Sequence, residues 1–461
     1  MQKRHFIVGA VACALASGAA NASALSQWPA QPVPASLGDP TLLVDGNGTA
    51  YLVGLDGMTA IATFGAPLGA PERVLSSEPR PWDAVSGVSA DGELVIAYTR
   101  TADRPRVHRR VRVVLRTPAG VTSAPVTISQ LGRTADTPAL AVAAGGEAIV
   151  AFVRHDADAR WHVQYALRRA SGMPFGPPRT VAGADGIVSR GTRIDVAADP
   201  KGGGLLTWVT RPADRSTPGR LMALVVDRDG AGAPVALEAR AAPNSYGIPH
   251  GRTAIAYASD GSGVLAWVGP RGSATNALDG DMLRSAPITH SGIGDAKTLG
   301  SYRGPLVGWD ATAEPGGRAT VVWASYPDYG ADTPGGHTTT VWTRSRLAGG
   351  SWSDPKALSN PKIHVSPGSL RRSSVVAAGD GTGHVLALWG ERSAYASSDD
   401  HLWLSARTTA GTWTPAQQVT PTTGAVMPAA AASPSGLLAV TWMTFAPGAA
   451  PGATLMFGAF G

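Results

Sequence analysis

The sequence predicts an all-β protein, a closed β-propeller built from four-stranded antiparallel blades. Three observations support this prediction. A short phrase recurs about every 55 residues along the chain, and each copy has the pattern of a strand, a turn and a second strand. Turn-forming residues are abundant, with 57 Gly and 36 Pro among 461 residues. The chain is 44% hydrophobic and 16% charged, a composition that can form a large core and is not typical of a disordered chain.

The repeated phrase is clearest in residues 192–208 and 252–267. Each copy begins with a strand of small residues, continues through a Gly-rich turn such as 260–263, and ends with a β-branched strand that carries an aromatic residue. A third and a fourth strand follow each phrase. The aromatic positions are Tyr98, Phe152, Trp208, Trp267, Trp323, Trp389 and Trp442. One aromatic at a fixed position in each unit favours packing between blades over stacking on sugars.

Eight units can be counted, which favours eight blades, with seven as the alternative. They begin near residues 39, 82, 137, 191, 251, 305, 371 and 427. The last unit stops after three strands, and residues 28–35 resemble the fourth strand of the preceding unit, at 413–420. We therefore expect an N-terminal strand to complete the last blade, because such closure removes exposed sheet edges. Residues 25–461 then form a single domain.

Residues 1–24 have the pattern of a secretory signal peptide. Lys3 and Arg4 precede an apolar run over 6–20, and a small-residue cleavage site follows, with cleavage near Ala22 or Ala24. Lipid attachment at Cys13 is the alternative, but the apolar run continues past this residue. We expect a secreted or periplasmic protein without disulfides, since Cys13 is the only cysteine, and without a membrane span.

The charge distribution argues against a nucleic-acid partner. The 39 Lys and Arg exceed the 33 Asp and Glu by only six, and this formal net charge of +6 is dispersed along the chain. The paired glycines at 145–146, 203–204 and 316–317 are read as turn residues, because no helix follows them to bind phosphate. A metal cluster of His155, Asp156, Asp158 and His162 matches no strong signature. We predict that the protein binds neither a cofactor nor a metal. We also predict that it is a monomer.

Arginine recurs in the loops that enter the first strand of each unit. In a propeller these loops open on the same face as the loops between the second and third strands, where arginine also recurs. Arginine suits bidentate contact with carboxylate, sulfate or phosphate. The predicted ligand-binding residues are Arg80, Arg133, Arg193, Arg252, Arg303 and Arg372. The alternative is that these arginines are solvated or form ion pairs with acids of the same loops, such as Asp156, Asp158 and Asp281.

Two turns resemble the Asp-box of sialidase-like propellers, whose pattern is Ser-x-Asp-x-Gly-x-Thr-Trp. They lie at 345–352 and 406–413, and both lack the aspartate, which is replaced by Leu347 and Thr408. The resemblance implies a propeller fold without pointing to a specific member. Sialidases use three arginines, a Tyr–Glu pair and an Asp acid, and here only Arg193-Ile194-Asp195 partly matches the family's Arg-Ile-Pro signature. Tyr302, Arg303 and Glu391 are of suitable types, but nothing in the sequence pairs them.

The leading functional interpretation is a secreted binding module for acidic glycans or other anionic ligands at the arginine-rich face. One alternative is a glycoside-processing enzyme, either a sialidase-like hydrolase or a polysaccharide lyase, and another is a protein-binding scaffold. The sequence contains no G-x-S-x-G elbow, H-E-x-x-H helix or P-loop, so it assigns no catalytic residue. This favours a binding protein over an enzyme. Propellers support all three functions, so the fold does not decide among them.

Overall fold

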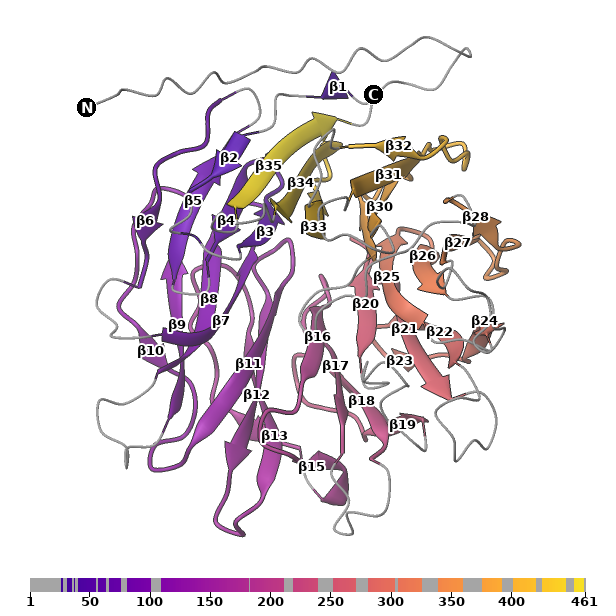
Figure 1. Ribbon diagram of the computed structural model, residues 1–461. Helices are drawn as coiled ribbons and strands as arrows, with labels where there is room; N and C mark the ends of the chain where they lie inside the picture. Colours follow the sequence, from indigo (N-terminus) through magenta and orange to yellow (C-terminus); the bar gives the residue numbers. More distant parts are fainter. Residues whose placement is uncertain are drawn as a thin grey trace, which may run out of the picture.

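The computed structural model describes residues 26–459 with internal gaps. The gaps are 28–30, 35–36, 38–39, 55–56, 64–65, 76–80, 101–108, 182, 211–218, 239–251, 271–280, 303–305, 326–338, 360–374, 392–400, 420–424 and 445–451. The described segments form eight antiparallel sheets arranged around a central axis (Figure 1). The prediction of an eight-bladed β-propeller is therefore confirmed. The first strands of successive blades contact one another, so they form the innermost ring of the propeller.

Blades 1 to 4 follow in chain order. Blade 1 contains β3 (Thr41–Val44), β4 (Ala50–Val53), β5 (Met58–Ala62) and β6 (Glu72–Arg73). Blade 2 contains β7 (Pro81–Val88), β8 (Leu94–Arg100), β9 (Arg110–Arg116) and β10 (Val126–Thr127). Blade 3 contains β11 (Ala135–Val142), β12 (Ala148–His155) and β13 (Trp161–Arg168), with β14 (Arg179–Thr180) and β15 (Ile187–Val188) both paired to β13. Blade 4 contains β16 (Ile194–Ala198), β17 (Gly204–Val209), β18 (Leu221–Val226) and β19 (Val235–Glu238).

Blades 5 to 8 repeat this pattern. Blade 5 contains β20 (Thr253–Tyr257), β21 (Gly263–Pro270) and β22 (Asp281–Thr289), with β23 (Gly292–Ile293) and β24 (Lys297–Tyr302) both paired to β22. Blade 6 contains β25 (Leu306–Glu314), β26 (Arg318–Ser325), β27 (Thr340–Arg346) and β28 (Lys356–Ala357). Blade 7 contains β29 (Val375–Gly379), β30 (Val385–Glu391), β31 (His401–Arg407) and β32 (Gln417–Gln418). Blade 8 contains β33 (Ala425–Ala432), β34 (Leu437–Thr444) and β35 (Gly452–Ala459), completed by β1 (Ser26–Gln27) and β2 (Gln31–Val33).

The N-terminal segment closes the ring, as the sequence predicted. β1 pairs antiparallel with the end of β35, where Ser26 lies opposite Ala459, and β2 pairs with the first half of the same strand, where Val33 lies opposite Ala453. The three lie together at the boundary between the last blade and the first (Figure 1). Val33 is buried there in one cluster with Leu42 and Leu455. Closure therefore combines backbone pairing with apolar packing.

The two faces of the ring differ in the connections that they carry. We call the end where the first strand of each blade begins the mouth face, and the opposite end, which carries the first-to-second and third-to-fourth hairpins, the turn face. Gly146, whose φ is +80°, lies in such a first-to-second hairpin. A Cβ on this glycine would lie 2.5 Å from the backbone nitrogen of Ser171. Glycine is therefore required at Gly146 to turn the chain, and not to bind phosphate.

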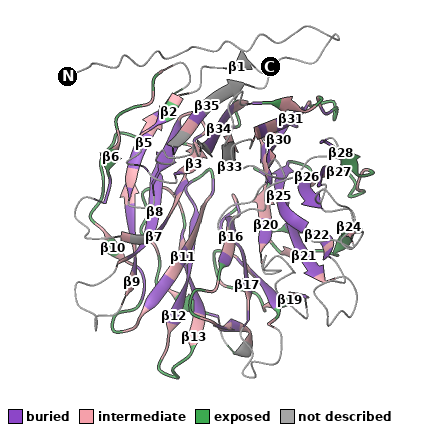
Figure 2. Ribbon diagram, viewed as in Figure 1, coloured by how far each residue is buried: buried purple, intermediate pink, exposed green. Residues whose placement is uncertain are grey.

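The repeated aromatic residues lie inside the blades. Buried residues follow the strands and exposed residues gather at the turns (Figure 2). The seven aromatic side chains of the repeated phrase are 0 to 4% exposed. Three of the indoles also donate a hydrogen bond to the preceding blade: Trp208 to the carbonyl of Asp185 (2.7 Å), Trp267 to the Glu238 carboxylate (2.9 Å) and Trp323 to the Tyr302 hydroxyl (2.6 Å). The prediction of inter-blade packing is confirmed.

We expect Trp267→Phe to lower the free energy of unfolding by about 1–2 kcal/mol. The ring packing is largely kept, but the buried Glu238 loses its indole donor and keeps Arg284 at 3.0 Å. Chemical denaturation of the wild type and the variant measures this loss. An unchanged free energy of unfolding would contradict the packing interpretation.

Among the described residues, helical structure is confined to 3₁₀ conformation at Leu37 and in the short turn η2 (Ala184–Gly186). Accordingly, no helix in the part of the chain that the structure describes is long and apolar enough to cross a membrane.

Candidate functional site at the channel mouth

Three of the six predicted ligand-binding arginines lie in the described part of the chain. Arg133 precedes β11, Arg193 precedes β16 and Arg252 precedes β20, so all three lie on the mouth face beside the first strands of blades 3, 4 and 5. The other three predicted residues, Arg80, Arg303 and Arg372, lie outside the described residues.

Blades 4, 5 and 6 bring two of these arginines into one charged cluster at the mouth. Arg193 and Arg252 interact electrostatically with each other, and Arg252 also interacts with Asp195 in β16 and Asp310 in β25. The indole of Trp309, also in β25, lies beneath the Arg252 guanidinium. We call these five residues the mouth cluster. They come from the beginnings of three consecutive inner strands, which the ring geometry places side by side.

The two aspartates of the mouth cluster join neighbouring blades. One oxygen of Asp195 accepts hydrogen bonds from the backbone nitrogen (2.8 Å) and the hydroxyl (3.2 Å) of Thr253, in the next inner strand. Asp310 accepts from the backbone nitrogens of Ala311 (2.9 Å) and Ala377 (3.0 Å), the latter in blade 7. Burial raises the pKa of Asp310, against the effect of these two donors and of Arg252. Both carboxylates thus have structural partners.

Arg252 is different, because its guanidinium has no hydrogen-bond acceptor among the residues that the structure describes. Its central carbon lies 5.6 Å from the centre of the Trp309 ring, a cation–π contact. No hydrogen bond or ion pair of this side chain is found with any residue of the described segments. Burial, followed by the charge of Arg193, lowers the pKa of Arg252 to about 10, so the side chain remains charged at neutral pH. A partly buried cation with unused donors can receive an anion.

Other mouth-face arginines have acidic neighbours, as the alternative interpretation expected. Arg193 contacts Asp195 at 2.5 Å, and Arg154 contacts Asp156 at 2.7 Å. The buried Asp136 contacts Arg109 at 2.5 Å. The mouth is therefore not a uniform basic collar.

The interpretation that loop acids pair with the arginines is wrong for Asp281. This residue is not a solvated loop acid, because it is 1% exposed and accepts a hydrogen bond from the backbone nitrogen of Leu306 at 2.7 Å. It joins blade 5 to blade 6, as Asp195 and Asp310 join their own neighbours.

The residues considered for sialidase chemistry have different surroundings. The Tyr302 hydroxyl accepts a hydrogen bond from Trp323, and burial raises the pKa of Tyr302 to about 12. Glu391 ends β30 in blade 7, two blades away from Tyr302, and burial raises its pKa. Tyr302 is therefore part of the inter-blade packing, and its environment does not favour the ionised form that a nucleophile needs.

The His155–His162 segment does not gather into a metal site. Asp158 contacts His162 at 3.0 Å, Asp156 is paired with Arg154, and the ring of His155 lies 5.2 Å from that of Trp161. Within the described ranges, no group of three His, Cys, Asp or Glu side chains could hold an ion.

A hollow of about 170 Å³ lies away from the mouth cluster, between the third-to-fourth hairpins of blades 3 and 4. It is lined by Tyr165, Leu167, Arg169, Met173, Pro174, Gly176, Pro177, Arg179 and Arg228. Arg228 contacts Glu147 at 3.3 Å, and Arg179 donates to the carbonyl of Asp229 at 3.2 Å. This hollow is small and its cations are partly paired, so we regard the mouth cluster as the better candidate.

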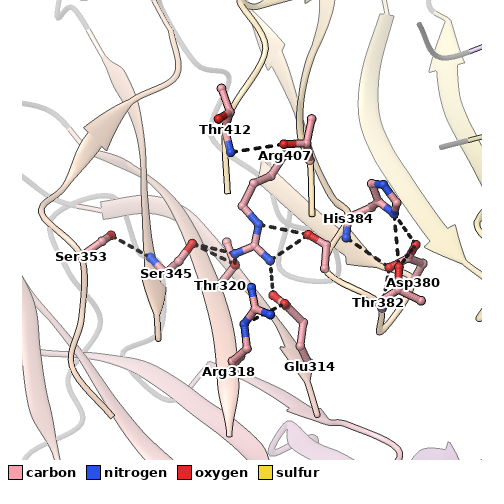
Figure 3. Close-up of polar contacts among 12 residues, drawn as sticks. Glu314, Arg318, Thr320, Ser345, Ser353, Asp380, Thr382, His384, Arg407 and Thr412 are labelled. Carbon is pink, nitrogen blue, oxygen red and sulfur yellow. Dashed lines mark hydrogen bonds and ion pairs between the residues drawn. The ribbon is translucent and has the colours of Figure 1, made fainter. Parts of the chain in front are cut away.

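Sequence reasoning missed a second set of arginines, which lie on the turn face. Arg116, Arg168, Arg346 and Arg407 each end the third strand of a blade, and each is 2 to 7% exposed. Arg407 binds Glu314, Thr320 and Ser345 of blade 6 (Figure 3). One feature of the sequence could have revealed these arginines. Each stands directly before the Gly-containing hairpin of its blade, in blades 2, 3, 6 and 7. Two of these hairpins are the Asp-box-like turns.

Comparison with known proteins gives similarity in fold alone. No family model matches the chain, and no curated protein matches it in sequence. Solved structures that resemble it include a lectin from Burkholderia pseudomallei, with TM-score 0.44, 14% identity, and coverage of 83% of this chain and 95% of the lectin. An α-L-arabinanase from Penicillium chrysogenum has TM-score 0.39 and 15% identity, with 83% and 94% covered. A Hadza microbial sialidase has TM-score 0.37 and 12% identity, with 77% and 72% covered. The propeller fold that the Asp-box-like turns implied is present in this chain.

Proposed function

We propose that this protein is a secreted or periplasmic binding module that holds an anionic ligand, such as an acidic glycan, at the mouth cluster. One observation carries the proposal: the Arg252 guanidinium is charged, partly buried and packed on Trp309, yet it has no acceptor among the described residues. The signal-peptide pattern of residues 1–24 supports export.

The chemistry of the cluster favours a carboxylate-bearing ligand. A planar guanidinium offers two parallel N–H donors, which match the two oxygens of a carboxylate. Arg193 lies close enough to lower the pKa of Arg252, and it is itself paired with Asp195 at 2.5 Å, so Arg252 is the cation that we assign to the ligand. Trp309 lies beneath the guanidinium, where its ring face favours a positive charge.

The surroundings of the two aspartates of the mouth cluster favour ligand binding over catalytic turnover. Glycoside hydrolysis needs a carboxylic acid and a carboxylate free to exchange protons with the substrate or water. Asp195 and Asp310 instead accept hydrogen bonds from the protein backbone. Both acids therefore stabilise the inter-blade contacts on either side of Arg252.

We expect Arg252→Met to weaken binding of acidic glycans at least tenfold, because it removes the donors and the charge but keeps the length of the side chain. The measurement is an array of neutral and acidic glycans, read at low and high salt with the mature chain of residues 25–461. Arg228→Ala is the matched control, since Arg228 is an arginine of the turn face with a side chain that is 52% exposed. High salt should weaken the interaction of the wild-type protein.

Stability measurements distinguish a binding residue from a structural one. If Arg252 serves a ligand, Arg252→Met should leave the unfolding midpoint unchanged or raise it, because a charge without an acceptor is removed from a partly buried position. Equal binding of acidic glycans by wild type and variant would overturn the proposal, as would a binding loss that accompanies a large loss of stability.

A further inference from the structure

Arg346 is a buried arginine that has no acidic partner in the described part of the chain. It ends β27 in blade 6 and is 5% exposed. Its Nε donates to the carbonyl of Gly317 at 2.6 Å, and one terminal nitrogen donates to the carbonyl of Gly263 at 3.0 Å. The other terminal nitrogen is buried and has no hydrogen-bond partner within the described segments. Burial lowers the pKa of Arg346, and no nearby acid offsets this effect.

The equivalent arginines of two other blades have an acid. Arg168 in blade 3 contacts Glu93 of blade 2, and Arg407 in blade 7 contacts Glu314 of blade 6. All three arginines end the third strand of their blade and reach toward the blade before. Arg168 also has one nitrogen without a partner, but the carboxylate of Glu93 balances its charge.

The missing acid can be located by comparing the first hairpins of blades 2 and 5. In blade 2 the carbonyl of Glu93 accepts from the backbone nitrogen of Ser89, and in blade 5 the carbonyl of Ser262 accepts from that of Ala258. The two segments read Ser-Ala-Asp-Gly-Glu and Ala-Ser-Asp-Gly-Ser. Ser262 therefore stands at the position of Glu93. It directly precedes Gly263, the residue that accepts from Arg346.

We propose that a small inorganic anion, of the size and charge of chloride, binds at Arg346 between blades 5 and 6 and replaces the missing carboxylate. An unneutralised buried charge is costly, whereas an anion with charge-assisted hydrogen bonds offsets that cost. The side chain of Ser262 is shorter than that of Glu93 and carries no charge, and its hydroxyl accepts from the backbone nitrogen of Gly317 at 3.1 Å, so Ser262 does not replace the carboxylate. The site lies on the turn face and is independent of the mouth cluster.

The test combines an anion titration with a variant that restores the acid. Thermal unfolding of the full chain is followed while chloride replaces gluconate at constant ionic strength. We expect the wild-type midpoint to rise by about 1–2 °C with chloride. Ser262→Glu should recreate the Asp-Gly-Glu sequence of blade 2, raise the midpoint in gluconate and remove the response to chloride. Arg346→Met should also remove that response.

A crystal soaked in bromide locates the ion directly. Anomalous density within hydrogen-bonding distance of the free Arg346 nitrogen supports the proposal, and the same density should be absent from Ser262→Glu. Water alone at this position, or an equal chloride response of wild type and Ser262→Glu, would overturn it. Because Ser262→Glu adds a group instead of deleting one, the test does not depend on whether Arg346→Met folds.

Discussion

Deletion of residues 26–33 should prevent stable folding, or lower the unfolding midpoint by roughly 10 °C or more. These residues form β1 and β2, which pair with β35 along most of its length. Without them the outer edge of blade 8 is left unpaired, and Leu455 loses the buried Val33 from its cluster. An open sheet edge also promotes association between chains. Thermal unfolding and size-exclusion chromatography measure the two effects.

A permuted chain provides the matched control. Ser26 lies directly opposite Ala459, so a short Gly-rich linker from residue 461 to residue 26 would continue β35 as an ordinary hairpin. A chain that begins at residue 34 and carries 26–33 at its C-terminus should therefore recover most of the lost stability. Removal of residues 1–24 alone should not lower the unfolding midpoint. Full stability of the deletion variant would show that the closing strand does not hold the ring together.

Arg407→Met should lower the free energy of unfolding by about 3–5 kcal/mol, the second large effect that we expect. Arg407 is 3% exposed and links blade 7 to blade 6 through Glu314, Thr320 (2.7 Å) and Ser345 (2.9 Å) (Figure 3). Its loss leaves the buried Glu314 with only Arg318, at 3.6 Å. Most of the cost is therefore the uncompensated charge of Glu314, and chemical denaturation measures it.

The double variant Arg407→Met with Glu314→Leu identifies the origin of this loss. It removes both charges, so it should be more stable than Arg407→Met alone. Arg220→Met is the control for an exposed pair, since Arg220 and Asp185 are 2.8 Å apart with side chains 48% and 37% exposed. We expect this control to cost less than about 1 kcal/mol. A double variant that loses the sum of the two single effects would show that the two charges are not coupled.

The sequence by itself determined the blade architecture, because the information for a blade is local. A turn glycine such as Gly146, a strand ending in an aromatic and a fixed order of four strands recur within each unit of the chain. The closing segment could also be identified, since residues 28–35 resemble the fourth strand at 413–420. Strand pairing within a blade joins neighbours in sequence, so repetition was enough to reveal it.

Only the tertiary structure decided which charged residues meet. The mouth cluster joins Arg193, Arg252 and Asp310 from three blades, and whether an arginine finds an acceptor depends on side chains more than 50 residues away. The sequence placed Arg193 and Arg252 on one face but could not show that Arg193 has Asp195 while Arg252 has Trp309. It also did not show that Arg346 and Arg407, which occupy equivalent positions in their blades, differ in having an acidic partner. Contacts across blades are non-local, and their electrostatics depend on burial that only the closed ring creates.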